Sequence, residues 1–195
     1  MLHRFLAFAL ALIFVAPVFA QGSAIETMLR TRDAEIKAII GTNKTVSDTQ
    51  RDRLRDVVNG VIDFEAMSRQ ALGTYWAELT PAQRTDFVDV FGEVVRAQSL
   101  ADLDLYRARV TYGEVEVDGK NAVAHTTARS GDVDAAVDYA LVRKGDAWHV
   151  TDIVIDGTST VTGYANSFQG LMRKRGVEAG YTKLMQSLRK RAARS

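Results

Sequence analysis

The chain of 195 residues carries 25 Lys and Arg against 24 Asp and Glu, and it contains no cysteine. The missing cysteine excludes disulfides, thiol catalysis and Cys-bound metals. The balanced charge argues against a nucleic-acid partner, because nucleic-acid-binding domains usually carry a strong basic excess. The length suits one ordinary domain with a hydrophobic core.

The first 20 residues have the pattern of a cleaved secretory signal. A basic start with Arg4 precedes an apolar run over residues 5–16, and Val18 and Ala20 stand at the positions that a signal peptidase reads. The alternative is a transmembrane anchor, but the run is shorter than the roughly 20 residues of a bilayer span. We therefore predict a signal peptide over residues 1–20 and a single domain over residues 21–195.

Helix signals dominate the next part of the chain. Capping boxes predict helix starts at Ser23 and Ser47, and Asp63 is placed to cap a short helix that ends at Gly73. Thr80 followed by Pro81 predicts a long fourth helix, which carries one apolar stripe of Phe87, Phe91, Val94 and Val95. About 85 residues after the signal are thus predicted to be largely helical.

From residue 110 the apolar period changes to two. Hairpin-type turns separate four segments, so a four-stranded antiparallel meander is predicted over residues 110–117, 122–129, 133–143 and 148–155. In the last strand, alternation puts Trp148, Val150 and Val154 on one face and Ile153 and Ile155 on the other. Both faces are therefore expected to be partly shielded from water.

After Asp156 and Gly157 the helical period returns. Thr158 or Ser159 is placed to cap a helix with an apolar stripe of Val161, Tyr164, Phe168, Leu171 and Met172, and a further helix follows Gly176. The predicted fold is α+β: a helical N-terminal half, a curved four-stranded antiparallel sheet and C-terminal helices. The aromatic stripe is expected to face a space between helix and sheet.

Catalytic signals are weak. His125 and His149 lie on predicted strands with Asp138, Asp152 and Asp156 near them in sequence, as in a small hydrolase or isomerase. However, the sequence has no metal-binding His pair, no Gly-x-Ser-x-Gly elbow and no phosphate-binding glycine loop. Asp152 is expected to anchor a backbone amide or a basic side chain, and the protein is predicted not to be an enzyme.

Three stretches in order resemble one family. They are LGTYW at residues 72–76, LTPAQR at 79–84 followed by Phe87, and WHVTDIVIDGTS at 148–159 leading to Tyr164 and Phe168. Behind a signal peptide, they resemble the MlaC family of periplasmic phospholipid-binding proteins, also known as toluene-tolerance auxiliary proteins. Ala165 and Ser167 stand where that family tends to have Arg and Gln. Another apolar cargo, such as a hopanoid, therefore stays open.

The resemblance implies a cystatin-like or nuclear-transport-factor-like cone with an apolar cavity, a periplasmic location and no cofactor. It also implies transport of phospholipid between an outer-membrane complex of lipoprotein and porin and an inner-membrane ABC transporter with its lipid-binding subunit, which maintains outer-membrane lipid asymmetry. The acyl chains need a dry apolar lining. The candidate lining consists of large apolar residues on facing elements: Tyr75, Trp76, Phe87, Phe91, Val94, Tyr139, Val150, Val154, Tyr164 and Phe168.

The C-terminal segment is strongly basic. Between Arg173 and Arg194 there are eight Lys or Arg and a single acid, Glu178. Two interpretations are open: a solvated helix face with a frayed tail, or contact with an anionic surface.

Overall fold

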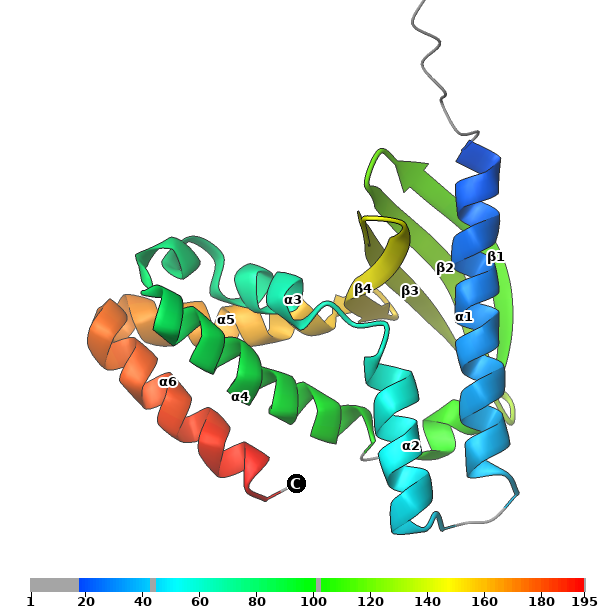
Figure 1. Cartoon of the computed structure of the whole chain (residues 1–195), viewed down its shortest axis with the longest axis horizontal. Helices are drawn as coiled ribbons and strands as arrows, with labels where there is room; N and C mark the ends of the chain where they lie inside the picture. Colours follow the sequence, from blue (N-terminus) through cyan, green and yellow to red (C-terminus); the bar gives the residue numbers. More distant parts are fainter. Residues whose placement is uncertain (1–17, 43–44, 101–102, 195) are drawn as a thin grey trace, which may run out of the picture.

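The computed structural model describes residues 18–42, 45–100 and 103–194. The N-terminal half contains α1 (Val18–Ile40), α2 (Asp48–Asn59), α3 (Phe64–Leu72), the 3-10 helix η1 (Gly73–Glu78), α4 (Pro81–Ser99) and η2 (Leu103–Arg107). The sheet follows with β1 (Arg109–Asp118), β2 (Asn121–Ser130), β3 (Val133–Lys144), β4 (Ala147–Ile155) and β5 (Thr158–Ser159). The chain ends with α5 (Thr160–Arg175) and α6 (Val177–Ala192), so the predicted α+β class is confirmed (Figure 1).

Four of the predicted helix starts are confirmed by their caps. Ser47 and Thr80 form reciprocal capping boxes with Gln50 and Gln83, while Asp63 and Ser159 accept backbone amides at the starts of α3 and α5. The predicted start at Ser23 is wrong, because α1 already begins at Val18. The predicted signal segment lies outside the described residues up to residue 17, and its last three residues belong to α1.

The sheet is an antiparallel meander in the order β1-β2-β3-β4-β5. Its four long strands confirm the predicted ones, and Gly119, Gly131 and Gly145 take the left-handed backbone conformation that the hairpin turns require. The two-residue β5 was not predicted. It pairs with the end of β4 and leads directly into α5.

Bulges bend the sheet and change which side chains share a face. In β1 the register shifts between Tyr112 and Val115, and in β4 it shifts at Thr151, because Leu141 pairs with Val150 while Ala140 pairs with Asp152. The alternation after Thr151 is therefore reversed, and Ile153 joins Trp148 and Val150. The predicted placement of Val154 on that face is wrong.

Two lobes hold most of the buried apolar side chains (Figure 1). In the sheet lobe, Ile25 and Leu29 of α1 pack on what we call the inner face of the sheet, against Ala124, Leu141 and Val150. The helical lobe consists of α3, η1, α4, α5 and α6 around its own core. A third, smaller cluster joins the end of α1 to α2, and it includes Ile40, Leu54 and Leu100.

Hydrogen bonds at β4 connect the helical lobe to the sheet lobe. The segment before α3 runs along this strand: the Asp63 amide donates to the Val150 carbonyl (2.9 Å) and the Val150 amide donates to the Val61 carbonyl (2.8 Å). At the start of α5, the Asp152 carboxylate accepts the amide of Val161 (3.0 Å) and the hydroxyl of Ser159. Two helices of the helical lobe thus begin on the same strand, and Asp152 anchors a backbone amide as predicted.

Candidate functional site

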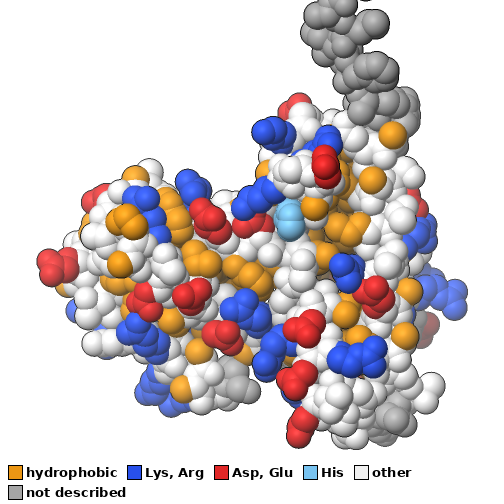
Figure 2. Space-filling view, viewed as in Figure 1, with side chains coloured by type: hydrophobic (Ala, Val, Ile, Leu, Met, Phe, Trp, Pro, Cys, Tyr) orange, Lys and Arg blue, Asp and Glu red, His pale blue; other side chains and the backbone are white. Residues whose placement is uncertain are grey.

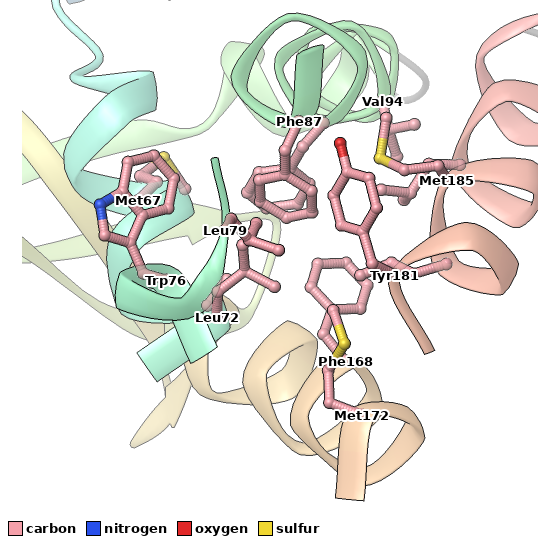
Figure 3. Close-up of a cluster of buried hydrophobic side chains, with 14 of the residues drawn as sticks. Met67, Leu72, Trp76, Leu79, Phe87, Val94, Phe168, Met172, Tyr181 and Met185 are labelled. Atoms are coloured by element: carbon pink, nitrogen blue, oxygen red, sulfur yellow. The ribbon is translucent and has the colours of Figure 1, made fainter. Parts of the chain in front are cut away.

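The aromatic residues of the helical lobe form a closed cluster. The Phe91 ring centroid lies 5.4 Å from that of Phe87, 4.8 Å from Tyr164 and 5.5 Å from Phe168. Phe87 and Phe91 are fully buried (Figure 3). This core holds seven of the ten predicted lining residues: Tyr75, Trp76, Phe87, Phe91, Val94, Tyr164 and Phe168. In this arrangement the rings of Phe87, Phe91, Tyr164 and Phe168 pack on one another.

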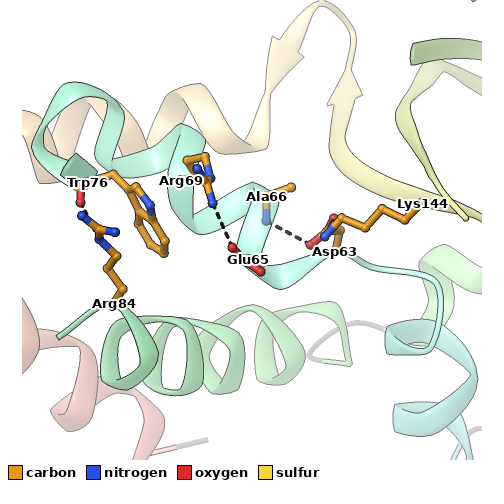
Figure 4. Close-up of polar contacts among 7 residues, drawn as sticks. All are labelled: Asp63, Glu65, Ala66, Arg69, Trp76, Arg84 and Lys144. Carbon is orange, nitrogen blue, oxygen red and sulfur yellow. Dashed lines mark hydrogen bonds and ion pairs between the residues drawn. The ribbon is translucent and has the colours of Figure 1, made fainter. Parts of the chain in front are cut away.

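Trp76 is held in this core by two arginines (Figure 4). The guanidinium of Arg69 lies 5.2 Å from its ring centroid, and the guanidinium of Arg84 lies 5.6 Å away. Arg84 also donates to the Trp76 carbonyl at 2.9 Å. These contacts fix Trp76 at its place in the helical lobe, which is a structural role.

The inner face of the sheet supplies the other apolar surface. Its exposure rises along β3 and β4, whereas Ala124 and Thr126 of β2 stay buried. One cross-strand row, Ala122, Leu141 and Val150, is buried. In the next row Tyr139 and Ile153 are half-buried, and in the row beyond Val137 is half-buried while Ile155 is 46% exposed. Burial raises the pKa of the Tyr139 hydroxyl, as does the charge of Asp33, so this hydroxyl stays neutral.

The apolar rows lie between two walls. In Figure 1, α1 stands on one side of β3 and β4 and the helical lobe stands on the other. Figure 2 shows the surface hollowed between the lobes, with hydrophobic side chains reaching it. Ile62 packs against both the helical core and the sheet core. We call this hollow between the sheet lobe and the helical lobe the inter-lobe groove.

The structure therefore divides the predicted lining residues. Tyr139 and Val150 belong to the sheet core under the inter-lobe groove, seven others belong to the helical core, and Val154 lies on the opposite sheet face. Ile153 and Ile62 were not predicted. Ile153 was missed because the bulge at Thr151 reverses its face, whereas the apolar pair Val61 and Ile62 before the Asp63 cap was a signal that could have been used.

An ion pair between a buried carboxylate and an exposed lysine lies where the helical lobe meets the sheet (Figure 4). The Asp63 carboxylate accepts the Ala66 amide at 3.0 Å and lies 2.5 Å from the Lys144 ammonium. Burial alone would raise the pKa of Asp63, but the bonds to Lys144 and Ala66 and the positive charge of Lys144 together hold it below its ordinary value. Asp63 thus joins three elements: α3, β3 and the edge of β4.

Asp63→Ala should lower the free energy of unfolding at neutral pH by about 1–3 kcal/mol, because it removes a helix cap and the partner of Lys144. The folded-state pKa of Asp63 is lowered, so its stabilisation is present above the unfolded pKa and is lost as the pH falls through the folded value. Denaturant titrations should show a difference from wild type that is large at neutral pH and shrinks below about pH 4. Asp132→Ala, at an exposed turn, is the control. An equal difference at both pH values would contradict this assignment.

The residues that suggested an enzyme do not form one site. His125 Nδ1 lies 2.8 Å from the Asp138 carboxylate and Nε2 lies 3.6 Å from Glu116. The hydrogen bond to Asp138 raises the pKa of His125. This pair lies on the sheet face opposite α1, because the neighbouring Ala124 packs on the inner face. Asp156 accepts the Ala136 amide at 2.9 Å, at the end of β4.

Residues 18–42, 45–100 and 103–194 contain no group of three or more His, Cys, Asp or Glu that could hold a metal ion. Within these same ranges, no helix combines the length and the hydropathy of a membrane span.

Comparisons with known proteins agree on one family. The model of the MlaC protein family matches residues 31–190. The intermembrane phospholipid transport system binding protein MlaC of Haemophilus influenzae is 25% identical over 134 residues, which cover 65% of this chain and 62% of that protein. The chain therefore matches somewhat less than two thirds of that relative's length.

A solved structure shares the fold. It is a phospholipid-binding protein from Ralstonia solanacearum in complex with a phospholipid, with a TM-score of 0.71 and 24% sequence identity. The superposition covers 89% of this chain and 97% of that one. The arrangement of helices and curved sheet is thus that of a known phospholipid-binding protein.

Proposed function

We propose that this chain, which belongs to the MlaC family, is a periplasmic phospholipid carrier that holds acyl chains in the inter-lobe groove. The observation that carries the proposal is the apolar inner face of the sheet, where side chains of β3 and β4 become more exposed toward Val137 and Ile155. The bound phospholipid of the Ralstonia solanacearum protein supports the class of cargo.

The energetics of acyl chains explain why a groove alone is insufficient. Exposing a methylene group to water costs about 0.8 kcal/mol, so a sixteen-carbon chain left in water costs about 12 kcal/mol. A carrier must therefore enclose the chains while the polar headgroup stays in water. The inter-lobe groove has the apolar floor that this requires.

In this proposal, binding of phospholipid increases the distance between the sheet lobe and the helical lobe. The rings of Phe87, Phe91 and Phe168 are in mutual contact, so no acyl chain fits between them in the arrangement described above. The links between the lobes are concentrated on β4, around Ile62 and at the start of α5. Acyl chains entering beside Ile62 would separate the two cores while these backbone links persist. Tyr139, Val150 and Ile153 then form one wall, with Tyr164 and Phe168 opposite.

The proposed pathway follows from the family. The carrier receives phospholipid at an outer-membrane complex of lipoprotein and porin and delivers it to an inner-membrane ABC transporter with its lipid-binding subunit, which maintains the lipid asymmetry of the outer membrane. The signal-like residues 1–20 support the periplasmic location. This function requires no catalytic group and no cofactor, in keeping with the dispersed positions of the histidines and carboxylates.

The proposal is tested by transfer of labelled phospholipid. Delipidated protein is incubated with vesicles that contain the labelled lipid, separated from them, and then mixed with unlabelled vesicles. We expect the label to leave with the protein and to appear in the second vesicles, because the groove shields the chains in transit. Protein that takes up no phospholipid, or that takes up only another apolar lipid, would refute phospholipid carriage.

A further inference from the structure

The C-terminal segment carries a net positive charge, whereas the part of the chain before it does not. Residues 173–194 contain eight Lys or Arg and one acid, whereas residues 21–172 contain 16 basic and 23 acidic residues. The basic side chains are all exposed, and they lie in the last turn of α5 and along α6. The two helices meet at the end of the helical lobe farthest from the sheet, and α6 runs from there back along the lobe toward α2 (Figure 1). We call this region the basic surface.

Part of this charge has a structural role. Arg189 pairs with Asp86 of α4 at 2.7 Å, which fastens α6 to the lobe. In the described part of the chain, no ion pair with a carboxylate is found for Lys174, Lys183 or Lys190. Basic residues in the last turns of α5 and α6 also interact favourably with the negative helix ends. Lys183 is in the middle of α6, so the helix dipole does not account for it.

The basic surface lacks an apolar anchor. The exposed large hydrophobic side chains of the described residues are Leu105, Val133 and Ile155, and none of them lies on α5 or α6. An open pocket at the corner between these helices is bordered by polar side chains such as Arg175, Lys183 and Glu178 and by the small or medium apolar residues Val177 and Ala179, with no aromatic residue among them. Stable protein interfaces usually depend on buried aromatic or aliphatic anchors. Long, mobile cations without such anchors fit a diffuse anionic surface better.

We infer that the basic surface docks the protein on anionic phospholipid bilayers. Several Lys and Arg side chains near such a bilayer act together, and their attraction extends only about one Debye length into solution. Docking of this kind is fast and reversible, and it does not insert into the bilayer. The basic surface is on α5 and α6 of the helical lobe, and none of its basic residues belongs to the sheet. Docking therefore does not depend on the proposed cargo.

The test is cosedimentation with vesicles at low ionic strength, using the full-length mature protein with whatever cargo it retains. The docking variant carries Lys174→Glu, Lys183→Glu and Lys190→Glu. The control variant carries Arg51→Glu, Arg53→Glu and Lys120→Glu, three exposed residues on α2 and the first hairpin turn. Both variants change the net charge equally, so a difference between them reports the position of the charge. Circular dichroism and lipid content confirm that each variant is folded and loaded like the parent.

We expect the parent to bind vesicles of phosphatidylcholine with phosphatidylglycerol and not vesicles of phosphatidylcholine alone, and to lose this binding as salt is raised. The docking variant should bind at least ~10-fold more weakly, since each basic residue near the surface contributes about fivefold. The control should stay within about twofold of the parent. The inference is overturned if the parent ignores the anionic vesicles, if the docking variant binds like the parent, or if both variants lose binding equally. Binding that survives high salt would also overturn it.

Discussion

Phe91→Ala should destabilise the protein by about 3–5 kcal/mol, which is the usual cost of removing a fully buried phenylalanine ring. Phe91 is the centre of the helical core, with ring contacts to Phe87, Tyr164 and Phe168. Its removal leaves a cavity, because the structure around a deleted core ring relaxes only partly. Denaturant titration measures the loss, and the melting temperature should fall by roughly 10 °C.

The matched control for this change is Leu105→Ala, at an exposed hydrophobic residue of η2. It removes apolar atoms that are already in water, so its effect should stay within about 0.5 kcal/mol. Phe91→Leu keeps most of the apolar volume and should fall between the two variants. A Phe91→Ala variant as stable as the control would mean that the rings of the helical core are not packed as described.

Ile153→Lys should abolish retention of phospholipid, while Val154→Lys should leave it unchanged. The two residues are neighbours and both are half-buried, but the bulge at Thr151 puts Ile153 on the inner face beside Tyr139. An ammonium group there would have to be buried without a partner against the acyl chains. A cost of only about 1.4 kcal/mol already lowers affinity tenfold, and the expected cost is larger.

Val154→Lys is a strict control because its side chain lies opposite Asp138 on the outer face, where a cation is tolerated. Bound phospholipid is quantified as phosphate per protein in both variants, after circular dichroism has shown the same fold. Loss in the Val154 variant with retention in the Ile153 variant would restore the simple alternation predicted from the sequence. If both variants retain phospholipid, the acyl chains do not bind against Ile153 or Val154.

The sequence predicted most of the secondary structure because its boundaries are chemically marked. Asp63, Thr80 and Ser159 cap helices in the structure, and the glycine turns separate the long strands. The prediction of a helix start at Ser23 was wrong because capping residues also occur inside helices. Ser23 lies within α1, and its carbonyl accepts a hydrogen bond from the Thr27 hydroxyl. Residues 18–22 contain no proline to stop the helix from starting earlier.

The site was harder to predict, for two physical reasons. A bulge adds one residue without changing composition, so the position of Thr151 in the run from Val150 to Ile155 left no mark on the sequence. An apolar stripe shows which side of a helix is buried, but it does not show whether facing stripes touch or leave space. The rings of Phe87 and Phe168, for example, are 5.9 Å apart in the core, a contact that the stripes alone do not show.

The central claim is that this chain carries phospholipid, and lipid analysis of the protein purified from its own periplasm tests it most directly. The protein is isolated without detergent and extracted with organic solvent, and the extract is analysed by mass spectrometry. The groove between the sheet and the helical lobe predicts phospholipid in amounts comparable to the protein. Purified protein that contains no lipid, or that contains a hopanoid in place of phospholipid, would contradict the claim.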